Sequence, residues 1–119
     1  MFAYTTASED GDNATGGGPV EFITDVNFDQ DRFLTTTAIT FATNLGAGVG
    51  ANLAASATAA INAAAALGGT QAVAAEFTFG GRTYLAINTD LAANFNDPTD
   101  LLLDITGATG TIDATDFIT

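Results

Sequence analysis

The fold is decided by GAGVGANLAASATAAINAAAAL, residues 46–67, and by the stretch that follows it. Residues 46–67 carry no charge and are mostly alanine, which has the best intrinsic helix propensity. The glycine pair at 68–69 is a strong signal for the end of a helix. We therefore predict a helix over 46–67, with one buried stripe that consists of Val49, Leu53, Ala57, Ile61, Ala64 and Leu67.

The following stretch is AVAAEFTFGGRTYLAIN, residues 72–88. Its side chains alternate in period two on both sides of Gly80-Gly81, which predicts a β-hairpin with a primed two-residue turn.

Shorter extended segments surround this centre. Alternation and β-branched residues predict strands at 1–5, 20–23, 35–43 and 101–106, and an extended end over 111–119. We expect an α+β fold that is mainly β: an antiparallel sandwich or roll with one alanine-rich helix packed on a face. The core residues that we expect are Phe22, Ile23, Phe28, Phe33, Ile39, Phe41, Leu53, Ile61, Leu67, Phe77, Phe79, Tyr84, Leu85, Ile87, Leu102, Ile105 and Phe117.

The composition excludes several classes of function. The 119 residues fit one domain, and 2 basic against 14 acidic residues give a net charge of −12. Such a chain repels nucleic acid and anionic lipid, so we expect neither as a partner. It has no histidine and no cysteine, which removes zinc sites, thiol nucleophiles and imidazole-based triads. We expect a protein that is not an enzyme.

Two motifs in the helical stretch have alternative interpretations. Residues 45–67 are long enough to cross a bilayer, but Asn52, Ser56, Thr58 and Asn62 would need polar partners there. We therefore expect no membrane span. Residues 46–51 match G-x-G-x-x-A, yet no acidic residue ends the next strand to hold a ribose, so we expect no dinucleotide site.

Acidic residues gather in the expected loops. Pairs spaced at i, i+2 recur, and a further group of acids and asparagines follows the hairpin. Carboxylates crowded together without basic neighbours repel one another, and Ca²⁺, which binds hard oxygen ligands, relieves that repulsion. Paired carboxylates also occur in glycosidases, but the chain has no tryptophan for a sugar cleft. The calcium ligands that we expect are Asp25, Asp29, Asp31, Asn88, Asp90, Asp97 and Asp100.

Several segments, in their order along the chain, resemble the C-terminal region of RTX (repeats-in-toxin) proteins. Phe2-Ala3-Tyr4 with Ser8-Glu9-Asp10 is similar to the F-x-Y…S-x-x-D strand that opens that region, and the segment 21–33 resembles its D-x-I-x-D-F segment. The F-G-G-x-T-Y-L hairpin at 79–85 with the alanine-rich helix is especially similar to the bluetail domain of cyanobacterial surface proteins. The G-G-x-G-x-D repeats of the family are absent.

The resemblance implies a non-enzymatic C-terminal domain of an extracellular or cell-surface calcium-binding protein. Residues 1–119 would be a single capping and secretion domain cut from a longer protein, because Met1 begins directly on a strand pattern. Its expected partners are an upstream β-roll of the same chain and a type I export machinery. The secretion signal would consist of the last four residues, Asp116, Phe117, Ile118 and Thr119.

Two further functions stay open. Strands rich in threonine, alanine and glycine have few charges to protect their edges, so copies of the chain could self-associate by strand addition. The chain would then be a structural subunit of a surface layer or matrix fibre. A small enzyme that works with carboxylates alone is the weakest of the three hypotheses.

Overall fold

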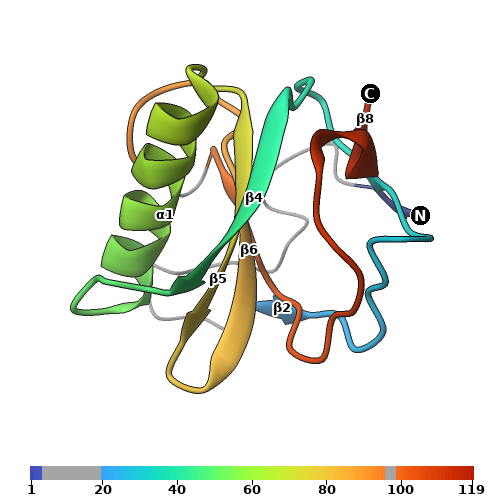
Figure 1. The fold of residues 1–119 in the computed structure, drawn as a ribbon, viewed down its shortest axis with the longest axis horizontal. Coiled ribbons are helices and arrows are strands. Elements are labelled where there is room, and N and C mark those ends of the chain that lie inside the picture. Colours follow the sequence, from blue (N-terminus) through green and yellow to red (C-terminus); the bar gives the residue numbers. More distant parts are fainter. Residues whose placement is uncertain (4–19, 96–98) are drawn as a thin grey trace.

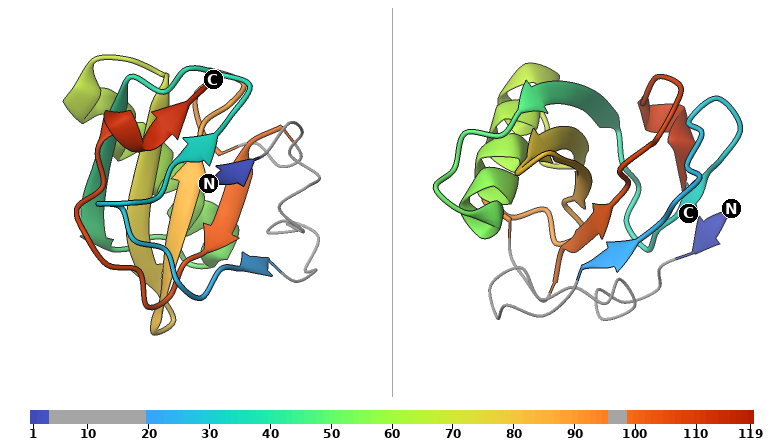
Figure 2. Two further views of the ribbon diagram at one scale, coloured as in Figure 1. Left: turned by 90° about the vertical axis from the view of Figure 1, so that its right-hand side faces the viewer. Right: turned by 90° about the horizontal axis from the view of Figure 1, so that it is seen from below.

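The computed structural model describes residues 1–3, 20–95 and 99–119, which form three layers. One helix, α1, covers one face of a five-stranded sheet, and a three-stranded sheet lies on the other side of that sheet (Figures 1 and 2). The fold class is thus confirmed as α+β and mainly β. Within the described ranges, none of the helical segments has the length and apolar character that crossing a bilayer requires.

The larger sheet has the strand order β2-β7-β6-β5-β4. The pairs β5–β6 and β6–β7 are antiparallel, as expected, whereas β4–β5 and β2–β7 are parallel. The parallel pair β4–β5 arises because α1 connects these two strands and returns the chain to the same end of the sheet. The strands are β2 (Glu21–Phe22), β4 (Phe41–Ala47), β5 (Val73–Phe79), β6 (Arg82–Ile87) and β7 (Leu101–Asp104).

The predicted hairpin is confirmed as β5–β6. Its turn residues Gly80 and Gly81 both have positive φ, 59° and 80°, which is the conformation of a primed turn. Glycine adopts this conformation with little strain because it has no Cβ atom.

Helix α1 spans Leu53–Gly68, so the predicted end is confirmed and the predicted start is wrong. The side chain of Asn52 caps the helix by accepting a hydrogen bond of 2.8 Å from the Ala55 N–H. Residues 46 and 47 belong instead to β4, where a bulge follows Asn44. Val49 therefore lies in the connection and is 83% exposed. The buried stripe consists of Ser56, Ala57, Ala60, Ile61 and Ala64, and Leu67 lies outside it with 66% exposure.

The smaller sheet has the order β1-β3-β8, and all its strands are parallel. They are β1 (Phe2–Ala3), β3 (Phe33–Leu34) and β8 (Phe117–Ile118). The Phe33 ring lies 5.1 Å from the Phe2 ring and 5.6 Å from the Phe117 ring, measured between centroids. Two expected extended segments differ in the structure. The strand expected at 35–43 begins only at Phe41. A short 3-10 helix, η2 (Ala114–Asp116), interrupts the extended end that was expected over 111–119.

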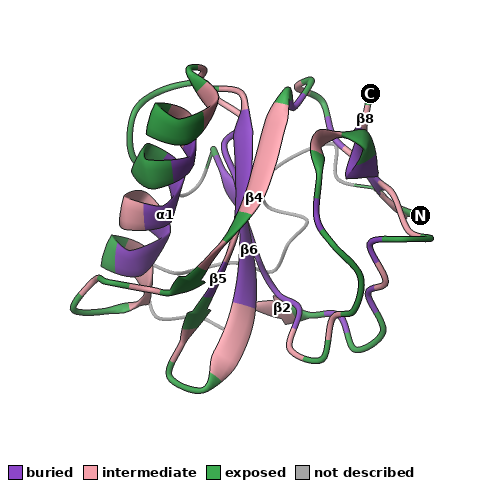
Figure 3. Ribbon diagram, in the orientation of Figure 1, coloured by how far each residue is buried: buried purple, intermediate pink, exposed green. Residues whose placement is uncertain are grey.

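The core lies on both faces of the larger sheet (Figure 3). Most of the expected core residues are buried, but Phe22 is 49% exposed because β2 is a short edge strand. Phe41, Leu53 and Phe79 are half-buried. Buried residues that the sequence did not predict include Val26, Val73, Phe95, Leu101, Leu103 and Ile112.

Candidate functional site

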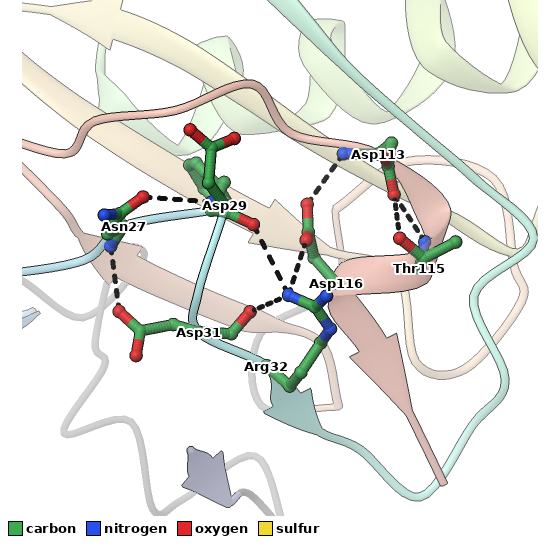
Figure 4. A network of polar contacts seen from close by, with 8 residues as sticks. Asn27, Asp29, Asp31, Arg32, Asp113, Thr115 and Asp116 are labelled. Atoms are coloured by element: carbon green, nitrogen blue, oxygen red, sulfur yellow. Dashed lines mark hydrogen bonds and ion pairs between the residues drawn. The ribbon is translucent and has the colours of Figure 1, made fainter.

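The acidic turn, residues 25–32, is held by hydrogen bonds to the backbone and the side chain of Asn27 (Figure 4). The Asn27 N–H donates to the Asp31 carboxylate at 2.8 Å, and the Asn27 side-chain oxygen accepts from the Asp29 N–H at 3.0 Å. The Asn27 carbonyl accepts from the N–H groups of Gln30 and Asp31. These local bonds explain why a turn forms where the sequence is dense in Asp and Asn.

The acidic turn is also held to the C-terminal segment of the chain. Phe28 N–H donates to the Thr109 carbonyl at 2.9 Å, and a Cβ atom at Gly110 would lie 2.8 Å from the Asp29 nitrogen. The approach of residues 110 and 29 therefore requires glycine at position 110, where φ is +80°.

Arg32 joins the turn to the carboxylate of Asp116. Its guanidinium lies 3.3 Å from the Asp116 Oδ1 atom and donates to the Asp31 carbonyl at 2.7 Å. The other oxygen of Asp116 accepts from the Asp113 N–H at 2.8 Å, and Asp113 in turn accepts from the Thr115 N–H. This capping box fixes η2 directly before β8.

The two carboxylates of this network have opposite pKa shifts. Burial raises the pKa of Asp116, which is 2% exposed, and the negative charges of Asp113 and Asp29 act in the same direction. The hydrogen bonds from Thr115 lower the pKa of Asp113. Both carboxylates accept hydrogen bonds within η2 and so position the end of the chain.

The acidic turn does not form a closed calcium site. Figure 4 shows the side chains of Asp29 and Asp31 directed to different sides of the turn, and the Asp31 carboxylate already accepts the Asn27 N–H. Asp25 and Asp31 line an open hollow of about 620 Å³ beside Phe2. Among residues 1–3, 20–95 and 99–119, no group of three or more acidic side chains could share a metal ion. The described donors thus do not fit a ready-made site, and calcium binding stays a prediction.

The second group of expected ligands shapes the loop after β6. Asp100 is fully buried, and its Oδ1 atom accepts from the Thr89 N–H at 2.8 Å and from the Asp90 N–H at 3.2 Å. Asp90 accepts from the Ala92 N–H. These carboxylates replace backbone partners that the loop lacks. Asp97 lies outside the described residues.

Asn88, also fully buried, connects two loops through hydrogen bonds of its side chain. Its side-chain nitrogen donates to the Gln71 carbonyl at 2.8 Å and to the Ala92 carbonyl at 2.9 Å. Its side-chain oxygen is buried without a hydrogen-bond partner.

A second ion pair, which the sequence did not predict, joins β6 to β7 beside the turn of the β5–β6 hairpin. Arg82 donates through its Nε atom to Asp104, and its guanidinium lies over the Phe22 ring, 4.7 Å from the centroid. Burial alone would raise the pKa of Asp104, but hydrogen bonds from Arg82 and Thr106 outweigh it and hold that pKa below its usual value. The sequence held one signal for this ion pair. The chain has only 2 basic residues among 14 acidic ones, so each arginine has many possible acidic partners, and both arginines do form ion pairs.

The expected secretion residues lie in and beside β8. Asp116 and Phe117 are buried, Ile118 is half-buried and Thr119 is exposed. Phe117 and Ile118 thus point to opposite faces, and only Phe117 enters the core, as expected for a strand.

Comparison with protein-family models, with curated proteins and with solved structures found no match for this chain.

Proposed function

We propose that this chain is a non-enzymatic C-terminal domain of a longer extracellular protein, and that its smaller sheet caps parallel β-structure that precedes it. The observation that carries the proposal is the parallel sheet β1-β3-β8, in which β1 is an edge strand. A stack of parallel strands ends in unpaired backbone groups, and a terminal module that pairs with them protects that end.

The geometry of β1 supports this role. The Phe2 N–H donates to the Arg32 carbonyl at 2.8 Å, so the backbone groups of Phe2 face β3. Because backbone groups alternate in direction along a strand, those of Ala3 face the free side. No described strand pairs with that side, and Ala3 is exposed.

The resemblance to RTX proteins supports the remaining parts of the proposal: calcium binding by the acidic turn and export through the last four residues. The net charge of −12 supports folding outside the cell, because self-repulsion destabilises the compact chain and bound cations reduce it.

The test of capping fuses residues 1–119 behind a calcium-loaded parallel β-roll and measures the melting temperature of the roll. We expect the fused chain to raise that temperature and the Ala3→Pro variant, which lacks the N–H on the free side, to lose the effect. The matched control is Ala3→Gly, which keeps the N–H and should keep the effect. The isolated domain should melt at the same temperature with either substitution. An unchanged melting temperature of the roll, or full protection by Ala3→Pro, would contradict the proposal.

A further inference from the structure

Strand β4 forms the long, open edge of the larger sheet. Among the described strands it pairs only with β5, and the Phe41 N–H donates to the Ala72 carbonyl at 3.2 Å. Alternation along the strand therefore directs the backbone groups of Ala42 and Asn44 to the free side. In the part of the chain that the structure describes, no loop, turn or side-chain group outside the β4–β5 pair makes a hydrogen bond to the backbone N–H or C=O of these two residues.

This edge lacks most of the features by which proteins protect an open strand. It has seven residues and contains no proline and no charge, and only the bulge after Asn44 interrupts it. The opposite edge, β2, has two residues, one of them Glu21. Figure 1 shows β4 in front of the sheet, beside α1.

The charges of the chain are distributed so that two copies repel each other least on this side. No charged residue occurs between Arg32 and Glu76, so β4, α1 and their connection carry none of the 16 charged side chains. Elsewhere a net charge of −12 makes two copies repel each other. The exposed side chain of Leu67 flanks this charge-free surface, next to Gly68, which lies against the Phe41 ring.

We propose that the β4 edge binds the β4 edge of a second copy of this chain, antiparallel and about a two-fold axis at Thr43. This register pairs Ala42 with Asn44 of the partner subunit, and the two equivalent pairs exchange four backbone hydrogen bonds. The side chains of Phe41, Thr43 and Leu45 share the face that carries α1, so Phe41 meets the partner subunit's Leu45. The result is one continuous ten-stranded sheet.

The proposed register also keeps the nearest acids apart. Glu76 of β5 pairs with Asn44 and lies one strand behind the edge. The two Glu76 side chains are then three strand spacings apart, roughly 14 Å, which exceeds the Debye length of about 8 Å at physiological salt. The dimer and the cap use different sheets, so either proposal can fail without the other.

Two measurements on the full chain test the dimer. The first is sedimentation over a range of concentrations. We expect Thr43→Lys, which places two like charges opposite each other, to weaken the dimer by at least about tenfold. Val49→Lys adds the same charge at an exposed neighbouring position and should leave the dimer intact. Thermal melting of both variants confirms that they fold.

The second measurement uses the absence of native cysteine. Thr43→Cys faces its own copy in a non-hydrogen-bonded pair, whose Cβ separation suits a disulfide. We expect mild oxidation to cross-link it at least about tenfold faster than Val49→Cys. A chain that stays monomeric at high concentration, or a dimer in which both cysteine variants cross-link equally slowly, would overturn the proposal.

Discussion

Replacing Phe117 by alanine tests how the C-terminal strand is held. The Phe117 ring is buried and stacks on Phe33, which also contacts Phe2 and Phe28. Removing a buried Phe ring costs about 3–5 kcal/mol of unfolding free energy, because the neighbouring rings cannot close the cavity fully. For 119 residues the unfolding entropy is about 0.25 kcal/mol/K, so the melting temperature should fall by about 12–20 °C.

The assay is thermal and urea unfolding followed by circular dichroism, with Ile118→Ala as the matched control. Ile118 is half-buried, so its truncation should cost only about 1 kcal/mol. The packing of β8 described above would be refuted if Phe117→Ala lowered the free energy of unfolding by less than about 1 kcal/mol, or if Ile118→Ala lowered it by more than Phe117→Ala does.

Three further changes should have distinct outcomes. Gly110→Ala should lower the free energy of unfolding by about 1–3 kcal/mol more than Gly107→Ala, because a Cβ at 110 would lie 2.8 Å from the Asp29 nitrogen, whereas one at 107 makes only an ordinary contact of 3.9 Å with the Thr24 carbonyl oxygen; equal losses in urea unfolding would contradict this. Burial raises the pKa of Glu76, so its folded form binds a proton more tightly and its contribution to stability grows as the pH falls from neutral through that pKa. Glu76→Gln should flatten this rise in a series of melting temperatures against pH, and an unchanged slope would count against it. Calcium titration by calorimetry should release heat with the native chain and less with the double variant Asp29→Asn/Asp31→Asn, with Mg²⁺ as the control ion; no heat and no shift of the melting temperature at millimolar calcium would remove the calcium proposal.

Features fixed by neighbouring residues could be predicted from the sequence. The β5–β6 hairpin depends on Gly80 and Gly81, and the end of α1 depends on Gly69, whose N–H donates to the Ala65 carbonyl at 2.9 Å. The predicted start of α1 was wrong because the alanine and glycine residues at 46–51 are compatible with either a helix or an edge strand. The pairing of β4 with β5 makes residues 46 and 47 part of a strand, and the local sequence pattern does not predict that pairing.

The contacts of the candidate site depend on residues far apart in the chain. Arg32 and Asp116 are separated by 84 positions, and no local pattern relates them. Two of the acids that were expected to bind calcium, Asp31 and Asp100, accept backbone N–H groups, and calcium binding by this set stays a prediction. Composition predicts that acids occupy loops, but which carboxylates share a space is determined only by the tertiary fold.

Export of a passenger protein tests the proposed function most directly. The passenger is fused to residues 1–119 in a host with a type I exporter, and secreted material is compared with the fusion that lacks residues 116–119. Phe33→Ala serves as a second variant, because it removes the ring on which Phe117 stacks and leaves residues 116–119 unchanged. We expect export of the full fusion and none of the truncated one. Equal export of the two fusions, or export of neither, would contradict it.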